Sequence, residues 1–157
     1  MDSDVIQGLQ NQLNHERTNA QRYFYIASAM SNMAYDGFSS FFTKQGQGEL
    51  EHANKIAEFL ISKRIQPEYR SLMGVNLPSN VAELTKEAFR TELATTTDLS
   101  TLYQLAEDNG EPQVCAFLVS LLVEQVDEET WASDLVDLVS RADENGLIVL
   151  DEIYGKK

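Results

Sequence analysis

Apolar residues recur along most of this chain at the three- and four-residue intervals that give an α-helix one apolar face. Four long segments show the pattern, at residues 4–34, 38–65, 79–108 and 112–140, and a shorter apolar segment follows at 146–154. The chain contains no strand-like alternation, internal repeat or low-complexity stretch. We therefore predict an all-α fold of four long helices and a short fifth helix, in a single domain over residues 1–157.

Helix-ending and capping residues separate these segments. Asp36-Gly37 is expected to close the first helix and Asn145-Gly146 the fourth, because glycine commonly follows the last turn of a helix. Asn80 precedes the third apolar pattern and is expected to cap that helix with its side chain.

The lengths of the connections predict how the helices are arranged. Short turns join the first pair and the last pair, which predicts two antiparallel hairpins. The middle connection, residues 66–78, can stretch about 40 Å, roughly the length of a helix of about 27 residues. A link of that reach predicts a four-helix bundle with one long crossover.

The apolar stripe of each long helix contains a carboxylate near its midpoint. In the second helix, for example, Phe42 and Ile56 flank Glu49 on the same face. No lysine or arginine lies on the stripes to neutralise these acids. We expect the acids to converge inside the bundle. They are Glu16, Glu49, Glu92 and Glu128.

Four unpaired carboxylates in one core would cost several kcal/mol each, whereas two divalent cations would cancel their charges. His52 follows Glu49 by three residues on the same face, which is the ligand spacing of di-metal helix bundles. Many carboxylates and one imidazole favour iron or manganese over zinc. The alternative is a structural or partner-binding bundle without metal. In that case the core-facing positions have been assigned one residue out of register, and the acids do not face the core.

The charge of the chain limits its partners. The sequence has 25 Asp and Glu against 12 Lys and Arg, a net charge of −13 and a pI near 4.4. Nucleic acids and anionic membranes need cationic surfaces, so we expect neither as a partner, whereas cations suit this surface. A single cysteine, Cys115, excludes an internal disulfide framework. Because no signal peptide or membrane-length apolar run is evident, we expect a cytoplasmic protein.

Several motifs together resemble those of the non-haem bacterial type of ferritin. The intervals between the motifs match as well as the motifs themselves, and the resemblance covers nearly the whole chain. It implies a ferritin-like four-helix bundle. The residues that carry it are Glu16 with Tyr23, Gln45-Gly-Gln-Gly-Glu49-Leu-Glu-His52-Ala53, Glu92, and Glu124-Gln125 followed by Glu128.

The resemblance implies a di-iron centre. Glu16, Glu49 and His52 would hold the first iron. Glu49 would bridge to a second iron, which Glu92 and Glu128 would complete. By the same resemblance, the centre would be supported by an electron-donating or orienting phenol, Tyr23, and by a hydrogen-bonding amide, Gln125.

The resemblance leaves a third iron site open. Gly48 stands where many bacterial ferritins carry a glutamate of that site, whereas Glu124 and Asp127 stand at two other positions of it. Gly46 and Gly48 are costly inside a helix, and we interpret them as room beside the centre, for close packing or for an iron path.

The implied function is that of a ferroxidase and iron store. Two Fe2+ ions would be oxidised together by O2, and the ferric product would be stored as mineral inside a 24-subunit homo-oligomeric cage. A di-iron bundle that removes O2 or peroxide without storing iron is the alternative. Haem is not expected, because Leu50 stands where bacterioferritins carry the haem-binding methionine and Glu128 where they carry a histidine.

Overall fold

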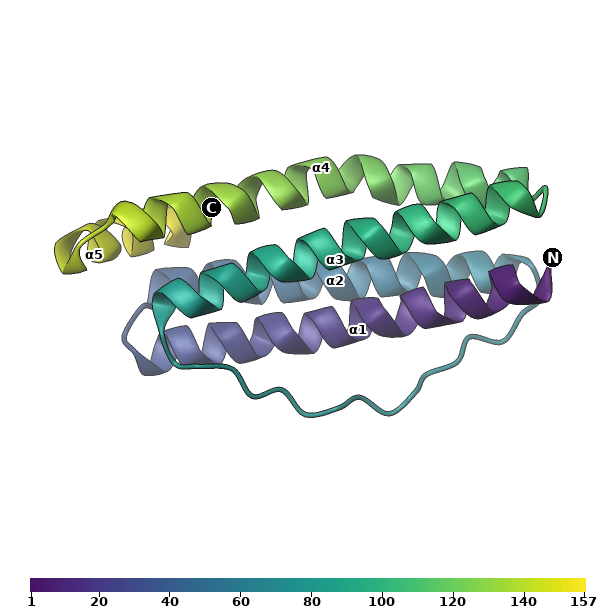
Figure 1. Cartoon of the computed structure of the whole chain (residues 1–157). Helices are drawn as coiled ribbons and strands as arrows, with labels where there is room; N and C mark the ends of the chain where they lie inside the picture. The colour runs from purple at the N-terminus through teal and green to yellow at the C-terminus, as the bar shows by residue number, and fades with distance from the viewer.

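The computed structural model describes residues 1–157 and contains five helices and no strand. The helices are α1 (Ser3–Asn32), α2 (Asp36–Ser62), α3 (Val81–Asp108), α4 (Pro112–Arg141) and α5 (Glu144–Gly155). The four long helices lie side by side as a bundle, with α5 at one end (Figure 1). None of the five combines the length and the apolar character that crossing a membrane requires. The predicted all-α class, four-helix bundle and short fifth helix are confirmed.

The first turn does not lie where it was predicted. It falls at residues 33–35, where Ala34 has a φ of 66°, and Asp36 and Gly37 begin α2 instead. Gly37 permits a close approach between helices, since a Cβ there would lie 1.8 Å from the carbonyl oxygen of Asp151 in α5. This glycine therefore marks a helix–helix contact and not a helix end.

The turn between α4 and α5 also lies earlier than predicted. The Asp143 carboxylate accepts a hydrogen bond of 2.8 Å from the Gly146 N–H and caps α5, so Asn145 and Gly146 belong to the first turn of that helix. The predicted cap of α3 is confirmed, because Asn80 Oδ1 accepts a hydrogen bond of 3.1 Å from the Glu83 N–H.

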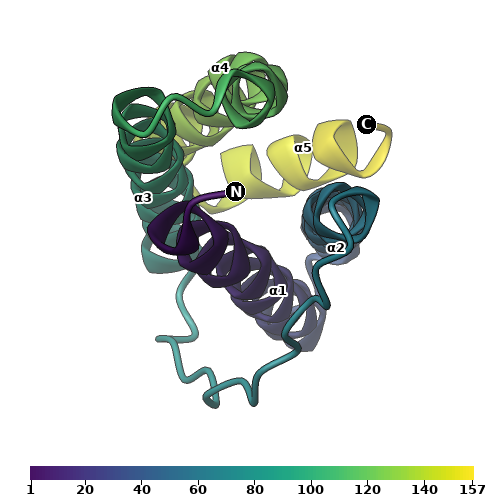
Figure 2. The ribbon, with the colours of Figure 1, turned by 90° about the vertical axis from the view of Figure 1, so that its right-hand side faces the viewer.

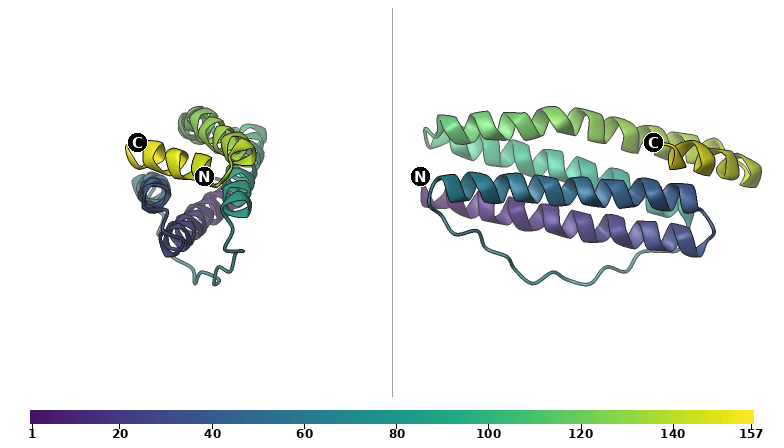
Figure 3. Two further views of the ribbon diagram at one scale, coloured as in Figure 1. Left: turned by 90° about the vertical axis from the view of Figure 1, so that its left-hand side faces the viewer. Right: turned by 180° about the vertical axis from the view of Figure 1, so that it is seen from behind.

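The crossover between α2 and α3 runs along the bundle (Figure 1; Figure 3, right), and α1 holds its first half. Asn14 Nδ2 donates to the Glu68 carbonyl at 2.8 Å, and Asn14 Oδ1 accepts from the Arg70 N–H at 2.9 Å. Gln10 makes a similar pair of bonds, to the Gln66 carbonyl at 2.9 Å and from the Glu68 N–H at 2.8 Å. The link carries the chain back to the opposite end of the bundle, so α2 and α3 run parallel.

Two apolar clusters of buried side chains lie inside the bundle, and a polar layer separates them. In α1, Leu13 belongs to one cluster and Tyr23 to the other, with Glu16 between them. The polar layer therefore lies near the middle of the bundle. Its most deeply buried acids and amide are Glu16, Glu49, Glu92 and Gln125.

The short helix α5 packs across the end of the bundle against the start of α2 (Figure 2). The Phe38 N–H donates to Asp151 Oδ1 at 2.7 Å, and the Tyr154 ring lies against Phe38 and Phe41 with centroid distances of 5.7 and 5.1 Å. Not all of its apolar surface is covered in this way. The exposed large apolar side chains of α5 are Ile148, Val149 and Ile153.

Candidate metal centre

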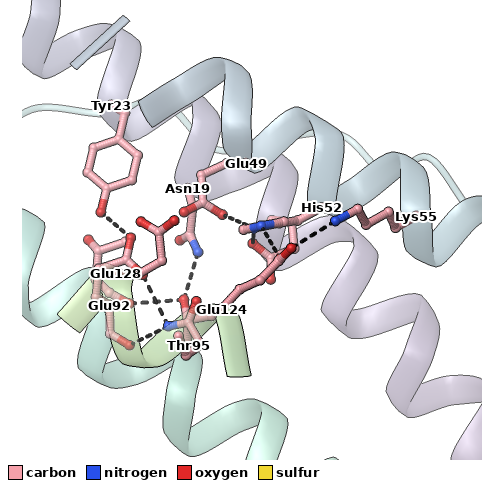
Figure 4. A network of polar contacts seen from close by, with 12 residues as sticks. Asn19, Tyr23, Glu49, His52, Lys55, Glu92, Thr95, Glu124 and Glu128 are labelled. Carbon is pink, nitrogen blue, oxygen red and sulfur yellow. Dashed lines mark hydrogen bonds and ion pairs between the residues drawn. The ribbon is translucent and has the colours of Figure 1, made fainter. Parts of the chain in front are cut away.

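The acids that interrupt the apolar stripes come together in the polar layer, where Glu49, Glu92 and Glu128 point toward a common space (Figure 4). Glu16, Glu49 and Glu92 are 1%, 2% and 0% exposed, and Glu128 is half-buried. Two groups of ligand atoms result, Glu16 with Glu49 and His52, and Glu49 with Glu92 and Glu128. The atoms of each group lie within 4.8 Å of one another, and Glu49 belongs to both groups.

Helix geometry supplies the imidazole of this layer. Glu49 and His52 are three residues apart on α2 and so share one face of the helix. His52 Nδ1 lies 3.4 Å from Glu49 Oε2 and 3.9 Å from Glu16 Oε2, with only 12% of the imidazole exposed. One nitrogen and two carboxylates therefore face the same point.

Burial raises the proton affinity of these acids. Desolvation is the main cause that raises the pKa of Glu49 from 4.5 to about 8, and the charges of Glu92 and Glu128 act in the same direction. Burial likewise raises the pKa values of Glu16, Glu92 and Glu128. One buried oxygen, Glu16 Oε2, has no hydrogen-bond partner. Cations would satisfy this oxygen and would oppose the effect of burial, because a nearby positive charge favours the ionised acids.

Two residues singled out in the sequence hold Glu92. The Tyr23 hydroxyl donates to Glu92 Oε1, and Gln125 Nε2 donates to Glu92 Oε2 at 3.1 Å. Burial, and then the charge of Glu92, raises the pKa of Tyr23 well above 10. The phenol therefore keeps its proton at neutral pH and acts as a hydrogen-bond donor.

Two further donors to the acids were missed in the sequence. Gln12 Nε2 donates to Glu16 Oε1 at 3.0 Å, and Trp131 Nε1 donates to Glu128 Oε2 at 2.7 Å. Each donor lies about one helical turn from its acid, at i−4 and i+3. A side-chain N–H at that spacing from a stripe carboxylate is the signal in the sequence that marks them as candidates, together with other polar residues at the same spacing.

The residues considered for a third iron lie outside both ligand groups. Glu124 is 41% exposed, with Oε2 2.9 Å from His52 Nε2 and Oε1 3.0 Å from Lys55 Nζ. Asp127 is exposed. A side chain at Gly48 would point into open space. The third site therefore stays a prediction.

The donor set suits particular metals. Four carboxylates and one imidazole, without cysteine, favour Fe2+ or Mn2+, whereas structural zinc sites use mainly cysteine and histidine. Because one carboxylate is common to both groups, the arrangement is suited to a pair of neighbouring ions.

Comparison with known proteins identifies the family. The family model described as ferritin-like domain matches residues 6–142. The chain belongs to the ferritin family. Bacterial non-heme ferritin of Staphylococcus aureus (strain USA300) is 25% identical over 160 residues, covering 100% of this chain and 96% of its own. The bacterial non-heme ferritin of Staphylococcus haemolyticus (strain JCSC1435) is 25% identical over 142 residues, which cover 90% of this chain and 86% of the relative. The predicted resemblance to this type of ferritin is confirmed.

The fold of this ferritin also matches solved structures. An open pore ferritin from the hyperthermophilic archaeon Archaeoglobus fulgidus superposes with a TM-score of 0.96, at 23% identity, over 100% of this chain and 99% of the other. An engineered closed form of the Archaeoglobus fulgidus ferritin gives 0.94 at 24% identity, over 100% and 98%. At these identities the likeness shows the fold.

The two glycines in the middle of α2 of this ferritin differ in their surroundings. A Cβ at Gly46 would lie 2.6 Å from Phe24 Cε1, so this position allows close packing of α1 on α2, as predicted. A Cβ at Gly48 would meet no atom within 4 Å. Packing therefore accounts for Gly46 and not for Gly48.

Proposed function

We propose that this chain oxidises Fe2+ with O2 at a di-iron centre inside each subunit and stores the ferric product as mineral within a cage. The observation that carries the proposal is the pair of ligand groups joined by Glu49. Membership of the ferritin family supports iron as the metal. The S. aureus relative, a bacterial non-heme ferritin, supports a centre without haem.

In this proposal Fe2+ is the substrate, and the chain supplies its ligands. Glu16, Glu49 and His52 hold one ion, while Glu49, Glu92 and Glu128 hold the other. Three protein ligands for each ion leave coordination positions open to water and O2. Two Fe2+ ions give up two electrons, which with two protons reduce one O2 to hydrogen peroxide.

The charge of the ligand set favours both the entry of substrate and the departure of product. Four ionised carboxylates balance two Fe2+ ions, so the loaded centre is neutral. Oxidation to two Fe3+ ions leaves two positive charges uncompensated in a buried layer. The ferric ions are therefore driven to hydrolyse or to leave, which regenerates the metal-free centre for another turnover.

Tyr23 and Gln125 are positioning residues in this proposal. Both donate to Glu92, so they fix the orientation of the carboxylate that binds the second ion. Trp131 does the same for Glu128, and Gln12 for Glu16. Donors to ligand carboxylates keep metal sites in their binding geometry before the ion arrives.

Storage requires assembly, and we propose a cage of twenty-four chains. The exposed apolar side chains of α5 support an interface at this end of the bundle. The net charge of −13 supports attraction of cations to the assembled particle.

The test is aerobic addition of Fe2+ to the purified protein, with ferric absorbance and particle mass both followed. We expect rapid oxidation and a particle near twenty-four times the 17.7 kDa chain mass. Glu16→Ala and His52→Ala should each abolish the rapid phase, whereas Glu58→Ala, at an exposed position of α2, should retain it. Particles of one or two chains that consume peroxide without forming mineral would favour the detoxifying alternative.

A further inference from the structure

A fifth carboxylate lies at the edge of the centre and is paired with a lysine. Glu124 of α4 reaches toward α2, where Oε2 is 2.9 Å from His52 Nε2 and Oε1 accepts a hydrogen bond of 3.0 Å from Lys55 Nζ (Figure 4). Glu124 Oε2 is buried and, apart from this contact with the imidazole, has no hydrogen-bond partner. Glu16 Oε2, on the other side of the imidazole, is likewise buried without a hydrogen bond.

Counting charges shows what Lys55 contributes. The two ligand groups contain four carboxylates, which two divalent ions neutralise. Glu124 is a fifth negative charge beside them, and the Lys55 ammonium at 3.0 Å neutralises it. These five carboxylates, the two ions and Lys55 then carry no net charge, so none of the five is left to compensate a third divalent ion.

The face of α2 on which this pairing occurs has space for a further ligand side chain. Gly48, His52 and Lys55 are spaced at i, i+4 and i+7, so they follow one another along a single helix face. A side chain at Gly48 would meet no atom within 4 Å. Steric exclusion therefore does not keep a further ligand away from this edge.

We propose that the Lys55 ammonium takes the place of a third cation, so that the chain binds two divalent ions and not three. The inference rests on the proposed di-metal function and adds to it the residue that sets the number of ions. Lys55 acts through Glu124. Removing the Lys55 ammonium frees the Glu124 carboxylate for a hydrated divalent cation.

Anaerobic titration with Co2+ tests the proposal, because its absorption spectrum and equilibrium dialysis count bound ions without any turnover. The wild-type protein should bind two equivalents. Lys55→Met should bind a third, about tenfold or more tighter than any third ion on the wild type, since a neighbouring positive charge has been removed. The double variant Lys55→Met/Glu124→Gln should return to two. Lys44→Met, at an exposed lysine of the same helix, is the matched control and should also bind two.

The absence of a third ion could be caused by the Lys55 ammonium or by the lack of a carboxylate at residue 48. The variant Gly48→Glu distinguishes these two causes. With Lys55 intact, this variant should still bind two ions. Three ions on Gly48→Glu, or only two on Lys55→Met, would overturn the proposal. A wild-type protein that binds no pair of ions would instead contradict the di-metal centre itself, so the two failures are distinguishable.

Discussion

Replacing Glu49 by glutamine measures the free energy of folding that the metal-free protein loses by burying this one acid. Glutamine keeps the size and the hydrogen-bonding oxygen of the side chain but cannot ionise. Glu49 is 2% exposed, and burial raises its pKa from 4.5 to about 8. The folded protein therefore retains a proton that the unfolded chain releases at neutral pH.

The sign and size of the effect follow from this difference in pKa. Below pH 4.5 both states are protonated and Glu49 does not penalise folding. As the pH rises from 4.5 to about 8, only the unfolded chain releases the proton, so stability falls by about 1.4 kcal/mol per pH unit. The loss is about 3 kcal/mol at pH 7 and levels off near about 5 kcal/mol above pH 8.

Urea unfolding of the metal-free protein, followed by the circular dichroism of the helices, measures this loss at a fixed chain concentration. Glu49→Gln should be more stable than the wild type by about 3 kcal/mol at pH 7, and its stability should depend less on pH. Glu58→Gln, at an exposed acid of α2, should behave as the wild type does. Suppose that Glu49→Gln lowers the free energy of unfolding of the metal-free protein at pH 8. The claim that burying an unpaired Glu49 carboxylate costs stability is then refuted.

Other substitutions test the fold and the support of the centre. Asn14→Ala removes the side-chain bonds to the crossover at Glu68 and Arg70 and should lower the free energy of unfolding by about 1–3 kcal/mol, measured by urea unfolding; unchanged stability would contradict this anchoring. Gly46→Ala should destabilise the fold by about 1–3 kcal/mol because of the contact with Phe24, whereas Gly48→Ala should be neutral or stabilise it by up to about 1 kcal/mol. Thermal melts of the two variants compare these effects, and equal shifts of the melting temperature would contradict the different surroundings of the two glycines. Tyr23→Phe leaves Glu92 Oε1 without its donor and should weaken Co2+ binding without abolishing it; dialysis measures the loss, and unaltered affinity would argue against a positioning role.

The helices and the polar layer could be predicted because periodicity determines which residues face the core. A carboxylate at the midpoint of each stripe is visible in the sequence, and the structure brings Glu16, Glu49, Glu92 and Glu128 together. Two turns were placed wrongly because glycine has more than one role. Gly37 permits contact with α5, and the sequence does not distinguish that role from a helix end.

The surroundings of the centre were harder to predict, because they depend on how neighbouring helices are aligned. Lys55 and Glu124 are 69 residues apart, and their pairing requires a particular register of α2 against α4. The donors Gln12 and Trp131 lie one turn from their acids, but many polar residues share that spacing in a helical chain. Only the rotation of each helix decides which of them face inward.

Crystals soaked anaerobically with Fe2+, with an anomalous difference map recorded at the iron absorption edge, test the central claim most directly. The central claim is that buried acids on four helices are tolerated because cations neutralise them. We predict two peaks in each chain, one in contact with Glu16, Glu49 and His52 and the other with Glu49, Glu92 and Glu128. A map whose only peaks lie at surface carboxylates, with these side chains free of metal, would contradict the account.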